Sequence, residues 1–170
     1  MSLVLRPATA ADHDAIVHVF LDCWRTSYAG LLPDEAITAM TDERADALWA
    51  GALARGEGTV LVAESGGRVQ GVTRFALTAD PGGEPYGVVH SLYVSPSAQG
   101  LGLGTALLTA AHDRLLAQGA QWVVLWVFAA NTPSVNFYRS RGWLPDGTTR
   151  TQPEFGQPEL RLRKTPVAGR

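Results

Sequence analysis

Hydrophobic residues recur along the chain with two spacings, which predict alternating helices and strands. The first predicted helix carries apolar residues three or four positions apart: Ile16, Val19, Phe20, Cys23 and Trp24. Near-continuous apolar runs at Gly87–Val94 and Trp122–Phe128 instead predict strands buried on both faces. The sequence therefore favours a mixed α/β architecture built around one sheet.

The remaining elements follow from shorter patterns and from cap and turn residues. Thr9, Thr41 and Thr132 are expected to cap helices, because a side-chain oxygen there can accept an unpaired amide hydrogen. Another helix should follow the glycine-rich turn near residue 103 and end near Gly119. The other predicted strands span residues 3–7, 59–64, 69–77 and 159–163, and the last of them is expected at a sheet edge.

Length, composition and charge limit the possible functions. A chain of 170 residues with 46% hydrophobic content suits a single domain, 1–170, with one core. A formal net charge of −2 gives no general reason to bind nucleic acid or an anionic membrane. We see neither a membrane-length apolar run nor a signal peptide, so we expect a cytoplasmic protein. One cysteine excludes an internal disulfide framework.

A strand that runs into a glycine-rich turn and then into a helix is the main chemical signal. Leu92–Val94 forms the end of the strand, and Gln99–Thr105 forms the turn and the start of the helix. The free amides at a helix start attract anions, and glycines let a phosphate approach the backbone. No Lys follows Gly104, which argues against a nucleotide-triphosphate loop. The G-x-G-x-G spacing also differs from the dinucleotide fingerprint.

Two motifs resemble those of the GNAT superfamily, the acetyl-CoA-dependent N-acyltransferases. The turn matches the pattern Gln/Arg-x-x-Gly-x-Gly/Ala at Gln99, Gly102 and Gly104. A second motif, Asn-x-x-Ala/Ser-x-x-Phe-Tyr followed by a glycine and an aromatic residue, matches these positions: Asn131, Ser134, Phe137, Tyr138, Gly142 and Trp143. The resemblance implies one domain with a mixed, largely antiparallel sheet that splays after its central strand, with helices on both faces.

The resemblance also implies roles for particular residues. Backbone groups at Leu92 and Val94 would pair with the pantetheine arm, and the Leu92 N–H would stabilise the oxyanion. Asn131 would hydrogen-bond the pantetheine, and Tyr138 would protonate the departing CoA thiolate. The pyrophosphate would be held by the backbone amides of the turn: Gln99, Gly100, Gly102, Leu103, Gly104 and Thr105.

The general base is less clear, because family members often carry a Glu where this chain has Val88. His90 lies on the same face by strand alternation and titrates in the right range, although a packed strand histidine is an equal alternative. Glu84, or water leading to a carboxylate, remains open. Trp24 and Tyr28, one helical turn apart, are either core residues or a wall of the acceptor site.

The function expected from the resemblance is acetyl transfer from acetyl-CoA to a primary amine by direct attack in a ternary complex. The alternative is a non-catalytic module that binds acyl-CoA as a sensor. The sequence does not name the amine, and a homodimer is an open possibility. No metal is expected, because no Cys/His/Asp cluster has ligand spacing, and His13, His18 and His112 are expected on the surface.

Overall fold

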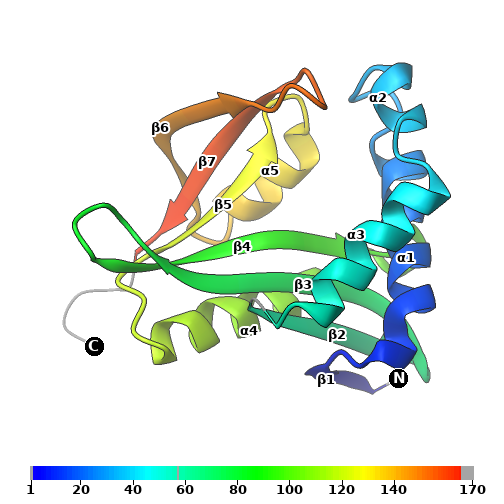
Figure 1. Cartoon of the computed structure of the whole chain (residues 1–170), viewed down its shortest axis with the longest axis horizontal. Helices are drawn as coiled ribbons and strands as arrows, with labels where there is room; N and C mark the ends of the chain where they lie inside the picture. Colours follow the sequence, from blue (N-terminus) through cyan, green and yellow to red (C-terminus); the bar gives the residue numbers. More distant parts are fainter. Residues whose placement is uncertain (1, 57, 166–170) are drawn as a thin grey trace.

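Seven strands form one sheet in the computed structural model, which describes residues 2–56 and 58–165 (Figure 1). The order across the sheet is β1-β2-β3-β4-β5-β7-β6, and every adjacent pair is antiparallel except β4 with β5. The strands are β1 (Leu3–Pro7), β2 (Thr59–Ser65), β3 (Arg68–Ala79), β4 (Pro85–Val94), β5 (Val123–Phe128), β6 (Leu144–Thr151) and β7 (Pro158–Lys164).

In the described part of the chain, five α-helices accompany the sheet: α1 (His13–Asp22), α2 (Asp34–Thr38), α3 (Asp42–Ala54), α4 (Leu103–Ala117) and α5 (Thr132–Arg139). A wider, π-helical turn at Cys23–Ser27 continues α1. Thr41 caps α3 as predicted, because its hydroxyl accepts from the Arg44 amide at 3.2 Å. The predicted cap of α5 was wrong by one residue: Asn131, and not Thr132, accepts from the Ser134 amide, at 3.3 Å. Within the described residues, no helix is long and apolar enough to cross a membrane.

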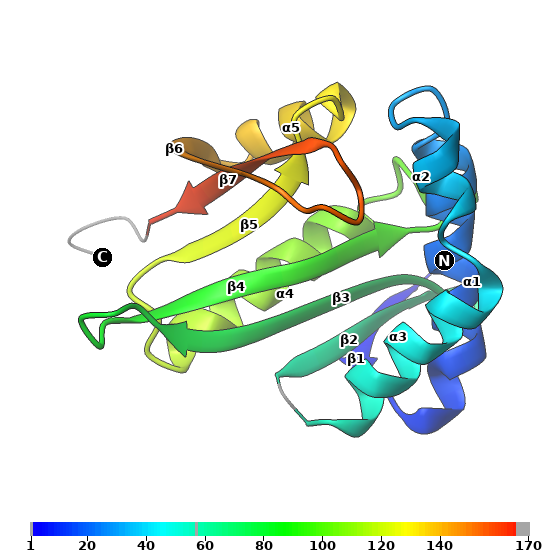
Figure 2. The same ribbon diagram turned by 45° about the horizontal axis from the view of Figure 1, so that its top comes forward.

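Helices cover both faces of the sheet, as predicted (Figures 1 and 2). The helices α1 and α3 pack on one face around Phe20, Trp49 and Val72. On the other face α4 packs through Leu107 and Leu115. A Cβ on Gly87 would lie 2.6 Å from Leu115 Cδ1, so the missing side chain on β4 lets α4 approach the sheet closely.

The central strands β4 and β5 part half-way along their length. They pair only from Gly87–Val123 to Val89–Leu125, although β4 continues to Val94 and β5 to Phe128. The parting coincides with a β-bulge, because Phe75 pairs with Val89 and Arg74 with Ser91. His90 is therefore the extra residue on β4, and the predicted splay of the sheet is confirmed.

Two further expectations need correction, and one strand was missed. The strand β7 lies between β5 and β6 instead of at the sheet edge, because β6 pairs along its outer side. The strand β6 was not predicted, since Pro145 and Gly147 interrupt its alternation and most of its residues are exposed. His112 is not a surface residue: it is 8% exposed and its ring packs against Trp143. His18 is exposed, as expected.

Candidate active site

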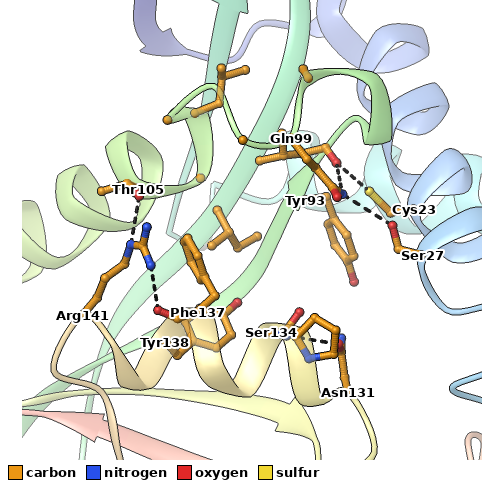
Figure 3. A pocket seen from close by; sticks show the side chains of 18 of the residues that line it. Cys23, Ser27, Tyr93, Gln99, Thr105, Asn131, Ser134, Phe137, Tyr138 and Arg141 are labelled. Atoms are coloured by element: carbon orange, nitrogen blue, oxygen red, sulfur yellow. Dashed lines mark hydrogen bonds between the residues drawn. The ribbon is translucent and has the colours of Figure 1, made fainter.

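A cavity of about 600 Å³ lies at the parting of β4 and β5 (Figure 3). Its walls come from the end of β4, the glycine-rich turn, α5 and the end of α1. All ten residues expected to bind the cofactor line it: Leu92, Val94, Gln99, Gly100, Gly102, Leu103, Gly104, Thr105, Asn131 and Tyr138. The fold therefore brings the two sequence motifs together on one cavity.

The glycine-rich turn presents unpaired amides to this cavity. The first hydrogen bond of α4 runs from the Ala106 amide to the Gly102 carbonyl, so the amides of residues 103–105 precede the helical ladder. Gly102 has φ of +89°, a left-handed conformation that a residue with a Cβ adopts only with strain. Free amides and the positive end of the helix dipole fit the charge of a pyrophosphate.

The backbone of β4 turns polar groups into the same cavity. The Val94 carbonyl accepts from the Cys23 thiol at 3.1 Å and from Gln99 Nε2 at 3.2 Å, so it points away from β3. Peptide groups two residues apart on a strand point to the same side. Leu92 therefore also directs its N–H and carbonyl into the gap between β4 and β5, where an amide-rich arm can pair with them.

Tyr138 of α5 and Asn131, which caps this helix, complete the wall opposite β4. Asn131 caps the helix with its Oδ1, which accepts from the Ser134 amide. The Nδ2 hydrogens of the same side chain can donate to a ligand carbonyl in the cavity. Burial raises the pKa of the Tyr138 hydroxyl above its usual value, and the nearby Tyr93 adds to this. Tyr138 is therefore protonated throughout the physiological pH range, so its hydroxyl has a hydrogen to donate.

The structure also brings residues to the cavity that were not predicted to be there. Cys23 is distant from β4 in sequence, yet it lines the cavity beside Val94. Burial raises the pKa of its thiol to about 12, so it is not a thiolate nucleophile at neutral pH. Further lining residues are Ser27, Leu31, Tyr93, Ala98, Pro133, Ser134, Phe137 and Arg141. Of these, only Pro133, Ser134, Phe137 and Arg141 lie within the span of the second motif, residues 131–143.

The acceptor-side residues are only partly brought together. Tyr28 lines the cavity, whereas Trp24 is 3% exposed and packs against Phe20 and Phe155 in the core. We therefore do not keep Trp24 as a wall of the acceptor site. Glu84 precedes the first residue of β4, about 26 Å from Leu92 at about 3.3 Å per residue. That separation is too large for direct proton transfer at the thioester.

His90 lies at the apex of the parting but lines a second cavity, of about 740 Å³, together with Val88 and Arg74. The two β4 side chains thus share a face, as alternation predicted. Burial lowers the pKa of His90 below 6.5, and the positive charges of Arg74 and Arg150 lower it further. Its neutral form, which can accept a proton, therefore predominates at pH 7.

Among the residues that the structure describes, no group of three or more His, Cys, Asp and Glu side chains could hold a metal ion.

Comparison with known proteins assigns the family. The model of the "Acetyltransferase (GNAT) family" matches residues 14–143. The chain belongs to this family. Mycothiol acetyltransferase of Arthrobacter sp. (strain FB24) is 39% identical over 87 residues, which cover 51% of this chain but 27% of that protein. The chain thus spans about a quarter of that relative's length. The "Uncharacterized N-acetyltransferase YuaI" of Bacillus subtilis (strain 168) is 27% identical over 81% of this chain and 78% of its own.

Solved GNAT structures share the fold. PaiA N-acetyltransferase from Thermoplasma acidophilum, in complex with coenzyme A, superposes with a TM-score of 0.78 at 19% identity, covering 98% of this chain and 100% of that one. A ribosomal-protein-alanine N-acetyltransferase from Brucella melitensis superposes with a TM-score of 0.72 at 24% identity, covering 96% and 99%. The predicted GNAT fold is confirmed.

The first prediction concerns the glycine-rich turn and the free amides of residues 103–105, which together form the proposed phosphate cradle. CoA should raise the melting temperature of the protein, because a ligand that binds only the folded state stabilises it by mass action. Replacing Gly102 with Val should abolish that shift, since the added side chain blocks the approach of the phosphate to the backbone. The measurement is a thermal melt with and without millimolar CoA.

Gly147→Val is the matched control, because Gly147 has a similar φ of +86° with no atom near its missing Cβ, and it lies on β6. Both variants should lose stability from backbone strain, but the Gly147 variant should keep the full CoA shift. A folded Gly102 variant that binds CoA as the wild type does would show that the cradle lies elsewhere.

Proposed function

We propose that this chain transfers an acetyl group from acetyl-CoA to a primary amine. The observation that carries the proposal is the continuity of one cavity from the amides of residues 103–105 to Leu92 and Tyr138. A phosphate held at these amides and a thioester held near Leu92 and Tyr138 would be joined by the pantetheine arm along the edge of β4. The cavity volume of about 600 Å³ lies within the usual range of about 300–1,000 Å³ for ligand pockets.

The residues would act in a direct attack by the amine. The Leu92 N–H would donate to the thioester oxygen and stabilise the negative charge that develops there. The Tyr138 hydroxyl would donate its proton to the departing sulfur. The buried, protonated thiol of Cys23 gives no route to an acyl-cysteine, so we favour a ternary complex.

Deprotonation of the amine falls to His90 in this proposal. His90 is the first residue of β4 beyond the last pair with β5, so it sits where the gap opens. Its neutral imidazole can accept a proton directly or through one water. Val88, at the position of the family's Glu, cannot do so.

The alternative function is a non-catalytic sensor that binds acyl-CoA. The absence of a carboxylate at Val88 favours it, because a sensor needs the cradle without a base. The names of similar proteins mention mycothiol and the alanine of a ribosomal protein, so a test should include a mycothiol-type amine and N-terminal alanine peptides.

Release of free CoA thiol decides between enzyme and sensor. The protein should release thiol from acetyl-CoA in the presence of at least one class of primary amine, with the acetylated amine appearing in equal amount by mass spectrometry. The panel would hold small metabolites, aminoglycosides, polyamines, a mycothiol-type amine and N-terminal peptides. Tight binding of acetyl-CoA with no product from any amine would favour the sensor.

A second prediction tests the leaving group. Tyr138→Phe removes one hydroxyl and little packing, so turnover should fall by about 100-fold, a size typical of lost general-acid catalysis, while CoA affinity barely changes. Because the pKa of Tyr138 is raised by burial, wild-type turnover should show no falling limb from this tyrosine up to pH 9. The measurement is kcat against pH for both proteins. An unchanged kcat in a variant limited by chemistry would reduce Tyr138 to a packing residue.

A third prediction tests the base. In wild type, kcat/KM for the amine should rise with pH through an apparent pKa below 6.5, since His90 must be neutral and its surroundings lower its pKa. His90→Ala should lose this limb, be slow at pH 7 and recover at high pH, where more of the amine is already deprotonated. His18→Ala, an exposed histidine on α1, is the control and should keep the limb. Retention of both limb and rate in His90→Ala would leave water and a carboxylate as the base.

A further inference from the structure

Arg141 is the only charged side chain among the described residues that line the cavity at the β4–β5 parting. It follows α5 directly and lies beside the first turn of α4 (Figure 3). A cavity that is to bind a dianionic pyrophosphate gains from a fixed positive charge, and every other lining side chain is neutral in the form expected at pH 7. This position makes Arg141 a candidate ligand of the phosphates.

The guanidinium is held in place by four contacts, one of which is a bond from its Nη1 to Ser140 Oγ at 2.9 Å. Its Nε donates to Thr105 Oγ1 at 2.9 Å, and its Nη1 donates to the Phe137 carbonyl at 2.9 Å. Its central carbon lies 3.9 Å from the centre of the Phe137 ring, a stacked cation–π arrangement. These contacts leave little rotational freedom, so the cost of ordering a long side chain is met before any ligand binds.

Thr105 links Arg141 to the phosphate cradle. The Thr105 amide is the last of the three amides that precede the helical ladder of α4, while its hydroxyl receives the Arg141 Nε. A phosphate bound at that amide would therefore lie beside the guanidinium. Phe137, on which Arg141 stacks, is also the residue that a Cβ on Gly104 would touch, at 3.4 Å.

Gln99 does not supply a charge to the cradle. It occupies the Gln/Arg position of the glycine motif, and its Nε2 donates to the Val94 carbonyl. It is neutral and directed at the backbone of β4 instead of at the amides of α4. The turn itself thus contains no cation, and the fixed positive charge of this cavity comes from Arg141, just after α5.

We propose that Arg141 binds the pyrophosphate of CoA and acts as the cation of this cradle. The guanidinium would donate charge-assisted hydrogen bonds to a phosphate oxygen that also accepts from the α4 amides. The proposal rests on CoA binding in the proposed function, but it does not require that the chain be catalytic. It assigns no phosphate contact to the side chain of Gln99.

The test compares three ligands in binding to wild type and Arg141→Gln. Calorimetry would measure the affinities of CoA, 3′-dephospho-CoA and acetyl-pantetheine, which lacks the pyrophosphate, the 3′-phosphate and the adenosine. We expect Arg141→Gln to weaken CoA and dephospho-CoA equally, by about 10- to 100-fold, as for a lost hydrogen bond to a charged group. Binding of acetyl-pantetheine should be unchanged. Arg141→Lys should recover part of the loss, since it keeps the charge without the planar fork.

Arg139→Gln is the matched control, because it removes the same charge from the exposed side of α5 and should leave all three affinities unchanged. An equal loss for all three ligands would mean that Arg141 only holds α5 against α4, and would overturn the proposal. A loss for CoA alone would assign Arg141 to the 3′-phosphate and overturn the pyrophosphate assignment. These readings use affinity only, so a wild type that binds CoA but acetylates no amine would refute the proposed function and leave this test decisive.

Discussion

The site depends on one structural constraint, the parting of β4 from β5 after Val89. Strand backbone that has lost its partner carries amides and carbonyls that must be satisfied in another way. At Val94 the protein does this itself, with the Cys23 thiol and the Gln99 side chain both donating to the carbonyl. At Leu92 the peptide group faces the cavity. The extra residue His90 bends β4 at the same point, so one irregularity both opens the binding gap and re-aims the side chain at its apex.

The titratable side chains near the gap between β4 and β5 are mainly neutral at pH 7. Burial raises the pKa of Cys23 and of Tyr93 to about 12 and raises that of Tyr138 as well. Burial lowers the pKa of His90, so this imidazole is also mainly neutral at pH 7. Among the described residues that line the cavity at the β4–β5 parting, the fixed positive charge lies at the proposed phosphate end, at Arg141 and the start of α4. Such a gradient would orient a ligand with its phosphates at one end and its neutral thioester at the other.

Local signals carried most of what could be predicted from the sequence. The glycine turn and the Asn131–Tyr138 motif each need only a few neighbouring residues to specify a conformation, and every cofactor residue named from them lines the cavity. Long-range pairing was harder to predict. The strand β6 has little hydrophobic alternation, and β7 is interior only because β6 pairs with it. Arg141 was visible within the second motif, but its contact with Thr105 joins residues 36 positions apart.

Periodicity also cannot tell which of two apolar surfaces a side chain meets. Trp24 and Tyr28 lie on one face of the same helical segment, yet Trp24 is enclosed by aromatic rings while Tyr28 reaches the cavity. His112 is buried for the same kind of reason, because Trp143 arrives from the distant segment after α5. The proposed acceptor side of the site is built mainly from such long-range contacts, whereas the proposed CoA side is built from two short motifs. The sequence therefore points to a cofactor more directly than to an amine, and the acceptor has to be found through the groups that surround His90.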